Sequence, residues 1–295
     1  MKSTEIICFG EVLWDIFPQG KKIGGAPFNV ACSLHQLGNQ VGFISRIGTD
    51  ALGKEIETQM DTIGVNKALL QYDTYHPTGT VSVSLDSTGA ASYTINENVA
   101  WDHIALENEA VEAVAQSKAF IFGSLIARSD AAKTLEALLV KAPFSVFDVN
   151  LRAPYYTLSS LKKLMQAAHM IKFNDDELYE IAEQLGSPFH SLDQHLKYIQ
   201  EITQADYICV TKGSHGAVLF HHHSFYYNSG YKIKVKDTVG AGDSFLATLI
   251  SGILQQRDLQ LTLNRACGMG ALVAGSEGAN PNISEAELDA FVNPQ

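Results

Sequence analysis

The sequence predicts an α/β protein in which a mainly parallel β-sheet is flanked by helices and accompanied by a small second β-sheet. Four short apolar runs between about residues 119 and 210 are separated by segments long enough for helices, which is the pattern of buried parallel strands joined by crossovers. Between about residues 72 and 101, polar and apolar residues alternate instead, as in a hairpin with one wet face. We expect both sheets to belong to a single domain over residues 1–295.

The composition narrows the classes of partner. Of the 295 residues, 46% are hydrophobic and 18% are charged, which is typical of a globular protein with a sizeable core. The net charge of −11 and the lack of a basic run argue against nucleic acid or an anionic membrane as a partner. The four cysteines form no C-x-x-C pair, as expected for free thiols in a reducing cytosol. With no signal-peptide pattern and no apolar run of the ~20 residues that span a bilayer, we expect a cytoplasmic protein.

The first predicted strand, residues 6–9, is followed closely by Asp15. Ligands of open α/β sheets bind beyond the carboxyl ends of the strands, so Asp15 is placed to accept hydrogen bonds from a polyol. A solvated loop aspartate is the alternative interpretation of this residue.

A glycine pair and an asparagine come next. Gly24 and Gly25 permit close approach of the backbone to a ligand, and Asn29 precedes an apolar helix predicted over residues 30–37. The Asn29 amide offers a donor and an acceptor to a sugar hydroxyl, or it only caps the helix.

Polar residues follow three of the four apolar runs, in the stretches 148–152, 174–177 and 211–216. They would line one crevice, because the carboxyl ends of parallel strands meet at one edge of a sheet. Asn174 and Glu177, three residues apart at a predicted helix start, suit Mg²⁺ directly or through water. The alternative is an N-cap with a first-turn acid, which is a common pairing.

The most specific stretch is Asp-Thr-Val-Gly-Ala-Gly-Asp-Ser-Phe at residues 237–245. It follows a strand predicted at 231–235 and runs into a helix predicted over 245–254. The backbone N–H groups of three residues would converge at the helix N-terminus, where they form a site for a phosphate or a developing oxyanion. These residues are Gly240, Ala241 and Gly242.

Asp243 would lie at the mouth of this anion hole. We expect its carboxylate to be held ionised there and to accept the proton of an incoming hydroxyl. An anion hole beside a proton acceptor is what phosphoryl transfer to an alcohol requires. The alternative is a glycine turn that caps a helix and binds nothing.

The string at 237–245 resembles the C-terminal signature of the ribokinase/PfkB family of sugar kinases, D-T-x-G-A-G-D-x-F, without departure. Further motifs of that family follow in order: G-G-x-x-x-N at 24–29, R-x-G-x-D at 46–50, for which we expect a mainly structural role, and N-x-x-E at 174–177. The loop Gly-Gly-Ala-Pro-Phe-Asn-Val-Ala at 24–31 looks most like that of bacterial fructokinases.

The resemblance implies a ribokinase-like fold whose small sheet is a lid over the sugar, formed by about residues 11–28 and 72–101. It implies an ATP-dependent kinase that phosphorylates a free sugar, and we expect this sugar to be D-fructose. An exposed apolar lid face would also favour a homodimer formed through the lid.

The resemblance also implies roles for individual residues. Substrate binding falls to Asp15, Gly25, Asn29 and Arg152, and catalysis to Asp243 with Gly240, Ala241 and Gly242. Nucleotide binding falls to Thr211, Gly213, Gly216, Gly240, Gly242, Ala274 and Gly275. Mg²⁺ would lie near Asn174 and Glu177, and the K⁺ of some family members near Asp237 and Val239.

Several alternative functions stay open. The pattern Asp148-x-Asn150-x-Arg152 resembles one shared by fructokinases and 2-keto-3-deoxygluconate kinases, and in the latter the arginine contacts substrate. A ribokinase, a nucleoside kinase or a sugar-phosphate kinase would use the same machinery. A non-catalytic sugar sensor and a hydrolase that uses the anion hole are the alternatives from other classes. The sequence has no G-x-x-x-x-G-K-[ST] and no G-x-G-x-x-G, which argues against a P-loop kinase and a Rossmann dehydrogenase.

Overall fold

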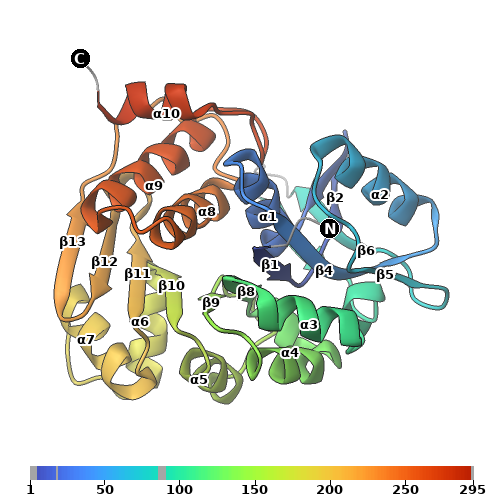
Figure 1. The fold of residues 1–295 in the computed structure, drawn as a ribbon, viewed down its shortest axis with the longest axis horizontal. Helices are drawn as coiled ribbons and strands as arrows, with labels where there is room; N and C mark the ends of the chain where they lie inside the picture. The colour runs from blue at the N-terminus through green and yellow to red at the C-terminus, as the bar shows by residue number, and fades with distance from the viewer. Residues whose placement is uncertain (1–4, 18, 86–90, 294–295) are drawn as a thin grey trace.

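The computed structural model describes residues 5–17, 19–85 and 91–293, which form one large and one small β-sheet with helices around them (Figure 1). The large sheet has nine strands. In spatial order they are β13 (Ser224–Asn228), β12 (Ala217–His221), β11 (Tyr207–Thr211), β10 (Met170–Asn174), β9 (Ser145–Asp148), β8 (Ala119–Gly123), β1 (Ile6–Phe9), β4 (Val41–Gly48) and β5 (Leu70–Asp73). All neighbours from β11 to β5 pair in parallel, and β12 and β13 add antiparallel pairs at one edge. The predicted parallel sheet is confirmed.

Helices cover both faces of the large sheet, and each face has its own apolar core (Figure 1). Alternate residues of β1 serve the two cores: Ile7 and Phe9 belong to one, and Ile6 and Cys8 to the other. The first core contains α3 (Asn108–Gln116), α4 (Ala131–Leu139), α5 (Leu158–Gln166), α6 (Asp175–Gln184) and α7 (Leu192–Thr203). The second contains α1 (Ala26–Gln36), α2 (Ala51–Ile63), α8 (Ala241–Leu254) and α9 (Leu259–Ala274), against which α10 (Glu285–Val292) packs.

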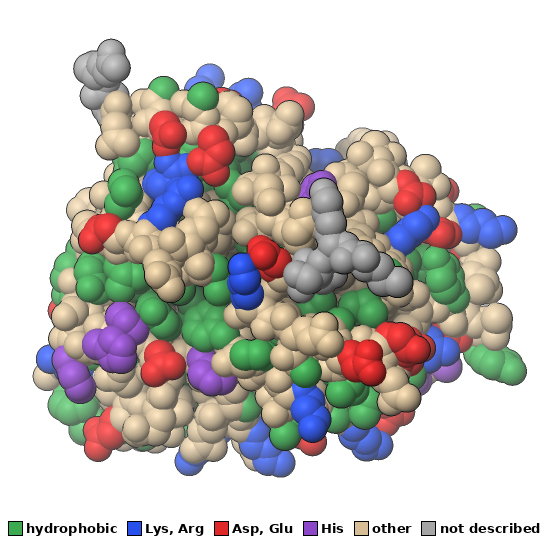
Figure 2. Space-filling model, in the orientation of Figure 1, with side chains coloured by type: hydrophobic (Ala, Val, Ile, Leu, Met, Phe, Trp, Pro, Cys, Tyr) green, Lys and Arg blue, Asp and Glu red, His purple; other side chains and the backbone are tan. Residues whose placement is uncertain are grey.

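Three single-turn 3₁₀ segments complete the described regular structure: η1 (Ala100–His103), η2 (Leu125–Arg128) and η3 (Gly213–His215). No helix in the described part of the chain is both long and apolar enough to cross a membrane. Figure 2 shows acidic and basic side chains interspersed over one face of the molecule.

The small sheet has four strands in the order β3 (Gly20–Gly24), β2 (Leu13–Phe17), β6 (Gly79–Leu85) and β7 (Ala91–Ile95). It joins the two segments that the sequence predicted as the lid, and we call it the lid sheet. The hairpin of β6 and β7 is confirmed, whereas its predicted turn at 86–89 lies outside the described residues. Strand β3, which pairs antiparallel with β2, was not predicted.

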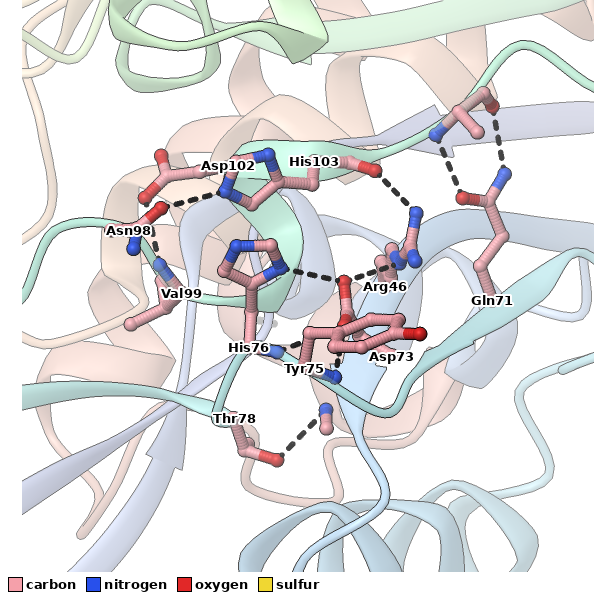
Figure 3. Close-up of polar contacts among 12 residues, drawn as sticks. Arg46, Gln71, Asp73, Tyr75, His76, Thr78, Asn98, Val99, Asp102 and His103 are labelled. Atoms are coloured by element: carbon pink, nitrogen blue, oxygen red, sulfur yellow. Dashed lines mark hydrogen bonds and ion pairs between the residues drawn. The ribbon is translucent and has the colours of Figure 1, made fainter.

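A polar cluster holds the base of the lid sheet, where the chain leaves β5 for β6 and returns through η1 (Figure 3). Arg46 forms an ion pair with the buried Asp73 (Nε to Oδ2, 2.9 Å) and donates a hydrogen bond to the His103 carbonyl (2.8 Å). Asp73 also accepts the backbone N–H of His76, whose ring stacks on that of His103 at 3.8 Å. Asp50 caps α2 and accepts from the backbone and hydroxyl of Thr78. The motif at 46–50 therefore has a structural role, as expected.

The strand predicted at 231–235 is wrong. Strand β13 ends at Asn228, and Gly230, with φ of 84°, turns the chain away from the sheet edge. The backbone N–H groups of Lys236 and Asp237 donate instead to the Ala274 carbonyl at the end of α9 (2.9 and 3.3 Å). The next helix, α8, begins at Ala241 rather than at Phe245, so its N-terminus lies directly after the Gly240 turn.

Candidate active site

A cavity of about 1100 Å³ lies between the lid sheet and the carboxyl edge of the large sheet. Its lining residues come from β2, β3 and the loops after β1, β8 and β9, from the ends of β10 and β11, and from the N-terminal turns of α1 and α8. The crevice predicted from polar residues at the strand ends is therefore present. Most of the predicted site residues line it: Asp15, Gly25, Asn29, Arg152, Asn174, Thr211, Asp237, Val239, Gly240, Gly242 and Asp243.

The centre of the site is a hydrogen bond between two helix N-termini. Asn29 Nδ2, in the first turn of α1, donates to Asp243 Oδ2, in the first turn of α8, at 2.8 Å. Asn280 Nδ2 donates to the side-chain oxygen Oδ1 of Asn29 at 3.1 Å, which fixes the orientation of the Asn29 amide. The suggestion that Asn29 only caps a helix is wrong, because α1 begins earlier than predicted and its N-cap is Gly25.

Glycine is required where the backbone passes closely at this site. Gly25 has φ of +109°, and a Cβ there would lie 2.4 Å from the Glu11 carbonyl oxygen. Gly240 has φ of +78°, and a Cβ there would lie 2.3 Å from the Ala279 carbonyl oxygen. Larger residues are excluded at both positions by sterics and by backbone conformation.

The turn before α8 presents part of the expected anion hole. Gly240 and Gly242 line the cavity at the positive end of the helix dipole. The Ala241 N–H instead donates within the turn to the Thr238 carbonyl (3.3 Å), and the Ala241 side chain packs against the cluster around Met269. The role of the Ala241 N–H in the anion hole stays a prediction.

The surroundings of Asp243 raise its pKa. Desolvation at the bottom of the cavity raises its pKa to about 6, and the nearby Asp148 carboxylate adds to the shift. Lys172, the hydrogen bond from Asn29, and Arg152 act in the opposite direction. With a pKa of about 6, the carboxyl group is mostly ionised at neutral pH and titrates near the range in which a general base works best.

Two further carboxyl groups and a cation line the cavity. Asp15 is half-buried, and desolvation raises its pKa while Arg152 and Lys22 oppose the shift. Glu11 was missed by the sequence analysis. It is 4% exposed and lines the cavity, and burial raises its pKa to about 7. Its Oε2 atom has no hydrogen-bond partner among the described residues. The available signal was its position directly beyond the central strand β1, the criterion that had selected Asp15.

Lys172 is the second residue that was missed. It lies on β10, is 7% exposed, and its Nζ donates to Asp148 Oδ1 at 2.9 Å. It also lines the cavity next to Gly242. The signal was a lysine inside the apolar run Met-Ile-Lys-Phe, where a buried strand otherwise has no charge.

Asn174 and Glu177 form the capping box of α6. Asn174 Oδ1 accepts the Glu177 N–H, and Glu177 Oε2 accepts the Asn174 N–H, each at 2.8 Å. Glu177 Oε1 accepts the Leu151 N–H at 2.8 Å, which ties the loop after β9 to the helix. The alternative of a capped helix is thus realised, and a magnesium role rests on lone pairs that these bonds leave free. Such oxygens fit a hydrated Mg²⁺ held through water.

The residues predicted to lie near K⁺ also form contacts within the protein. Asp237 Oδ1 accepts the Val239 N–H at 3.1 Å, and Lys22 Nζ lies 3.7 Å from Asp237 Oδ2. Within the described ranges, no group of three or more His, Cys, Asp or Glu side chains is arranged to hold a metal ion.

Four predicted nucleotide-binding residues do not lie among the described residues that line the cavity. Gly213 and Gly216 belong to the turn between β11 and β12, where a Cβ on Gly216 would lie 2.1 Å from the Asn228 carbonyl oxygen. Ala274 and Gly275 lie at the end of α9, where the Ala274 carbonyl accepts the N–H groups of Lys236 and Asp237. Their predicted contacts with nucleotide stay predictions.

Comparisons with known proteins agree with this fold. The model of the pfkB family carbohydrate kinases matches residues 3–286. A fructokinase of Escherichia coli is 26% identical over 94% of this chain and 95% of its own length. A double mutant of the Vibrio cholerae O395 fructokinase, solved in a fructose, ADP and potassium ion bound form, superposes with a TM-score of 0.85, 23% identity and 99% coverage of both chains. A Xylella fastidiosa fructokinase with bound ATP gives 0.85, 22% and 98% of both chains.

At these identities the solved structures establish the shared ribokinase-like fold, and the family model covers nearly the whole chain. The chain belongs to the pfkB family of carbohydrate kinases.

Proposed function

We propose that this protein is a fructokinase, which transfers the γ-phosphate of ATP to a hydroxyl of D-fructose. The observation that carries the proposal is the Asn29–Asp243 pair, which places a carboxyl group between a lid-covered cavity and the N-terminus of α8. The fructokinases with which the chain shares its fold and about a quarter of its residues support the choice of sugar.

In the proposed reaction, the sugar lies under the lid sheet, where Asp15, Asn29 and Arg152 hydrogen-bond its hydroxyls. The attacking hydroxyl gives its proton to Asp243, and its oxygen forms a bond to the γ-phosphorus. The bond from the γ-phosphorus to the bridging oxygen breaks, and ADP leaves with that electron pair. N–H groups of the turn at Gly240 and Gly242 stabilise charge on the transferring group.

The lid sheet and the cations complete the proposal. Closure of the lid would exclude water, which competes with the sugar as a phosphoryl acceptor. Asn174 and Glu177 would hold Mg²⁺ through water, and Asp237 and Val239 would face a K⁺ ion. When bound, Mg²⁺ neutralises the phosphate oxygens of ATP. A second copy of the chain would cover the outer face of the lid sheet in a homodimer.

The test is ADP release from Mg-ATP with fructose, ribose, 2-keto-3-deoxygluconate, adenosine and fructose 6-phosphate. We expect the highest kcat/KM with fructose. In the Asp243→Ala variant, turnover should fall by ~10²-fold or more while ATP affinity is kept. A higher kcat/KM with another acceptor would refute the choice of sugar, and turnover that survives Asp243→Ala would refute the mechanism. Binding of a sugar without any turnover would support the sensor.

One observation favours a second candidate substrate, 2-keto-3-deoxygluconate. The exposed Arg152 guanidinium borders the cavity and lies near enough to Asp15 and Glu11 to lower their pKa values. A keto-acid substrate needs a cation for its carboxylate. Arg152→Ala should then abolish use of 2-keto-3-deoxygluconate selectively, whereas a fructokinase should lose only part of its affinity for fructose. Steady-state kinetics with both sugars separates the two.

A further inference from the structure

A buried ion pair forms part of the cavity floor. Lys172 Nζ on β10 donates to Asp148 Oδ1 at the end of β9, and the two side chains are 8% and 5% exposed. Lys172 lines the cavity, whereas its partner lies behind it. Asp148 Oδ2 has no hydrogen-bond partner in the described part of the chain, so the pair is not fully satisfied by the protein.

The Lys172 ammonium is aimed at the turn that begins α8. Its Nζ lies 3.4 Å from the position that a Cβ on Gly242 would occupy. Because Gly242 has no side chain, the ammonium lies close to the backbone of the turn. Gly242 is one of the two residues of the anion hole that line the cavity. The positive charge of Lys172, on the sheet, and the positive end of the α8 dipole therefore lie close to the same residue, Gly242.

The groups around this ammonium are mostly acidic. Asp148 on β9, Glu177 on α6 and Asp243 on α8 all face it, and the Cys209 thiol of β11 lies nearby. Burial lowers the pKa of Lys172, but the three carboxyl groups outweigh burial and hold this pKa above its usual value. The lysine thus lies among acids at the place where a phosphoryl group would add further negative charge.

A structural role alone accounts poorly for this arrangement. Removing two charges from water costs about as much as their attraction returns, and well-packed apolar residues of equal size are often as stable. A cavity wall is an unfavourable place for an ion pair that serves only packing. An ammonium beside an anion hole, in contrast, stabilises charge that grows in the transition state.

We propose that Lys172 is a further catalytic residue, whose ammonium contacts the transferring phosphoryl group beside Gly242. This inference rests on the proposed phosphotransfer, and Asp148 serves to hold the lysine in place. The charge of Lys172 acts more strongly on the transition state than on bound sugar, so its loss lowers kcat and leaves the sugar KM nearly unchanged.

The decisive variant replaces both partners by apolar residues of the same shape, Asp148→Leu with Lys172→Met. It leaves no unpaired buried charge, so we expect a melting temperature within a few degrees of wild type. We expect kcat with the preferred sugar to fall by ~10²-fold or more, with the sugar KM within about threefold. Calorimetry should show unchanged affinity for ADP and an affinity at least about tenfold lower for ADP with aluminium fluoride, which mimics the transferring group.

The matched control is Asp148→Asn, which keeps Lys172 and its charge. Because Asp148 holds the lysine in place, we expect a plateau kcat between those of wild type and Lys172→Met, with the acid limb of the pH profile moved to lower pH because Asp148 raises the pKa of Asp243. Lys172→Met alone should move that limb to higher pH, because Lys172 lowers the same pKa. The double variant should return the limb towards wild type and still have the low plateau.

A folded double variant with near wild-type kcat would overturn the inference. If the double variant does not fold, Asp148→Asn decides: a plateau kcat as low as that of Lys172→Met would show that the intact pair, not the ammonium, is required. If the wild type turns over no sugar, the proposed function fails. Binding of ADP with aluminium fluoride would then still report whether Lys172 contacts a phosphoryl-like anion.

Discussion

At the scale of single residues, the site depends on carboxyl groups whose surroundings set their charge. Asp243 receives one hydrogen bond from Asn29 and lies near the ion pair of Lys172 and Asp148, whose two charges shift its pKa in opposite directions. Glu11 has neither a cationic hydrogen-bond partner nor full solvation, so it titrates at a higher pH. These two groups give separate, measurable pH dependences.

The pH dependence of activity should follow the ionisation of Asp243. Asp243 accepts a proton only when ionised, and its pKa of about 6 predicts that kcat/KM falls as the pH drops through 6. Asn29→Ala removes a hydrogen bond that lowers this pKa, so the acid limb should move to higher pH and the plateau should fall by roughly tenfold. Rate profiles from pH 5 to 9 measure both effects. An acid limb that stays in place in the variant would contradict the assignment.

The second pH dependence concerns stability. Burial raises the pKa of Glu11 in the folded state from 4.5 to about 7. The stability that the protonated carboxyl group contributes is therefore fully present below pH 4.5 and is lost as the pH rises through 7. The shift corresponds to about 3 kcal/mol. Glu11→Gln should therefore gain stability relative to wild type between pH 5 and 8, as measured by urea unfolding. The exposed Glu112→Gln is the control and should show a constant difference.

At the scale of elements, the sequence predicted best where one element decides its own structure. Hydrophobic periodicity alone was enough to predict the four strands from β8 to β11 and the β6–β7 hairpin. Strand β3, Gly-Lys-Lys-Ile-Gly, has little strand propensity and forms because β2 offers a partner. Residues 231–235 alternate like a strand but do not join the sheet, because the chain turns at Gly230 and residues 236 and 237 then bond to the end of α9.

Prediction of the site residues was limited in the same way, because some of them depend on distant parts of the chain. Motif residues such as Asn29 and Asp243 could be found in the sequence because their types and spacing carry the chemistry. Lys172 and Glu11 could not be ranked, because their roles depend on how close other strands and helices bring them to charges and to the cavity. Ala241 shows the converse, since a motif position had its N–H occupied by a local turn.

The polar cluster at the lid base gives a prediction at this scale. Asp73 is 1% exposed, and although burial opposes it, hydrogen bonds from the His76 and Tyr75 backbone, together with Arg46, hold its pKa at about 2 instead of 3.8. Its stabilisation, about 2 kcal/mol, is present above pH 3.8 and is lost as the pH falls through 2. Asp73→Asn should lower the free energy of unfolding at pH 7 by at least about this amount. Asp130→Asn, in an exposed ion pair with Lys133, should change it by less than about 0.5 kcal/mol.

At the scale of the whole molecule, the lid sheet covers a cavity whose floor belongs to the large sheet. Bound sugar would contact both, so its binding should slow amide exchange in β2 and β6 and change exchange little in β9 to β11, which are already buried. Hydrogen-exchange mass spectrometry with and without sugar measures this difference. ADP alone should give less protection of the lid sheet. Equal protection everywhere would contradict a lid that closes on sugar.

The Asn29–Asp243 hydrogen bond joins residues 214 positions apart. A ribosome synthesises α1 early and α8 near the end, so the first helix must wait through most of translation for the partner that completes the site. A chain cut before residue 241 contains Asn29 but lacks Asp243, the proposed base. Enzymatic activity would therefore report that α1 and α8 have docked, and during synthesis it could arise only after α8 has emerged.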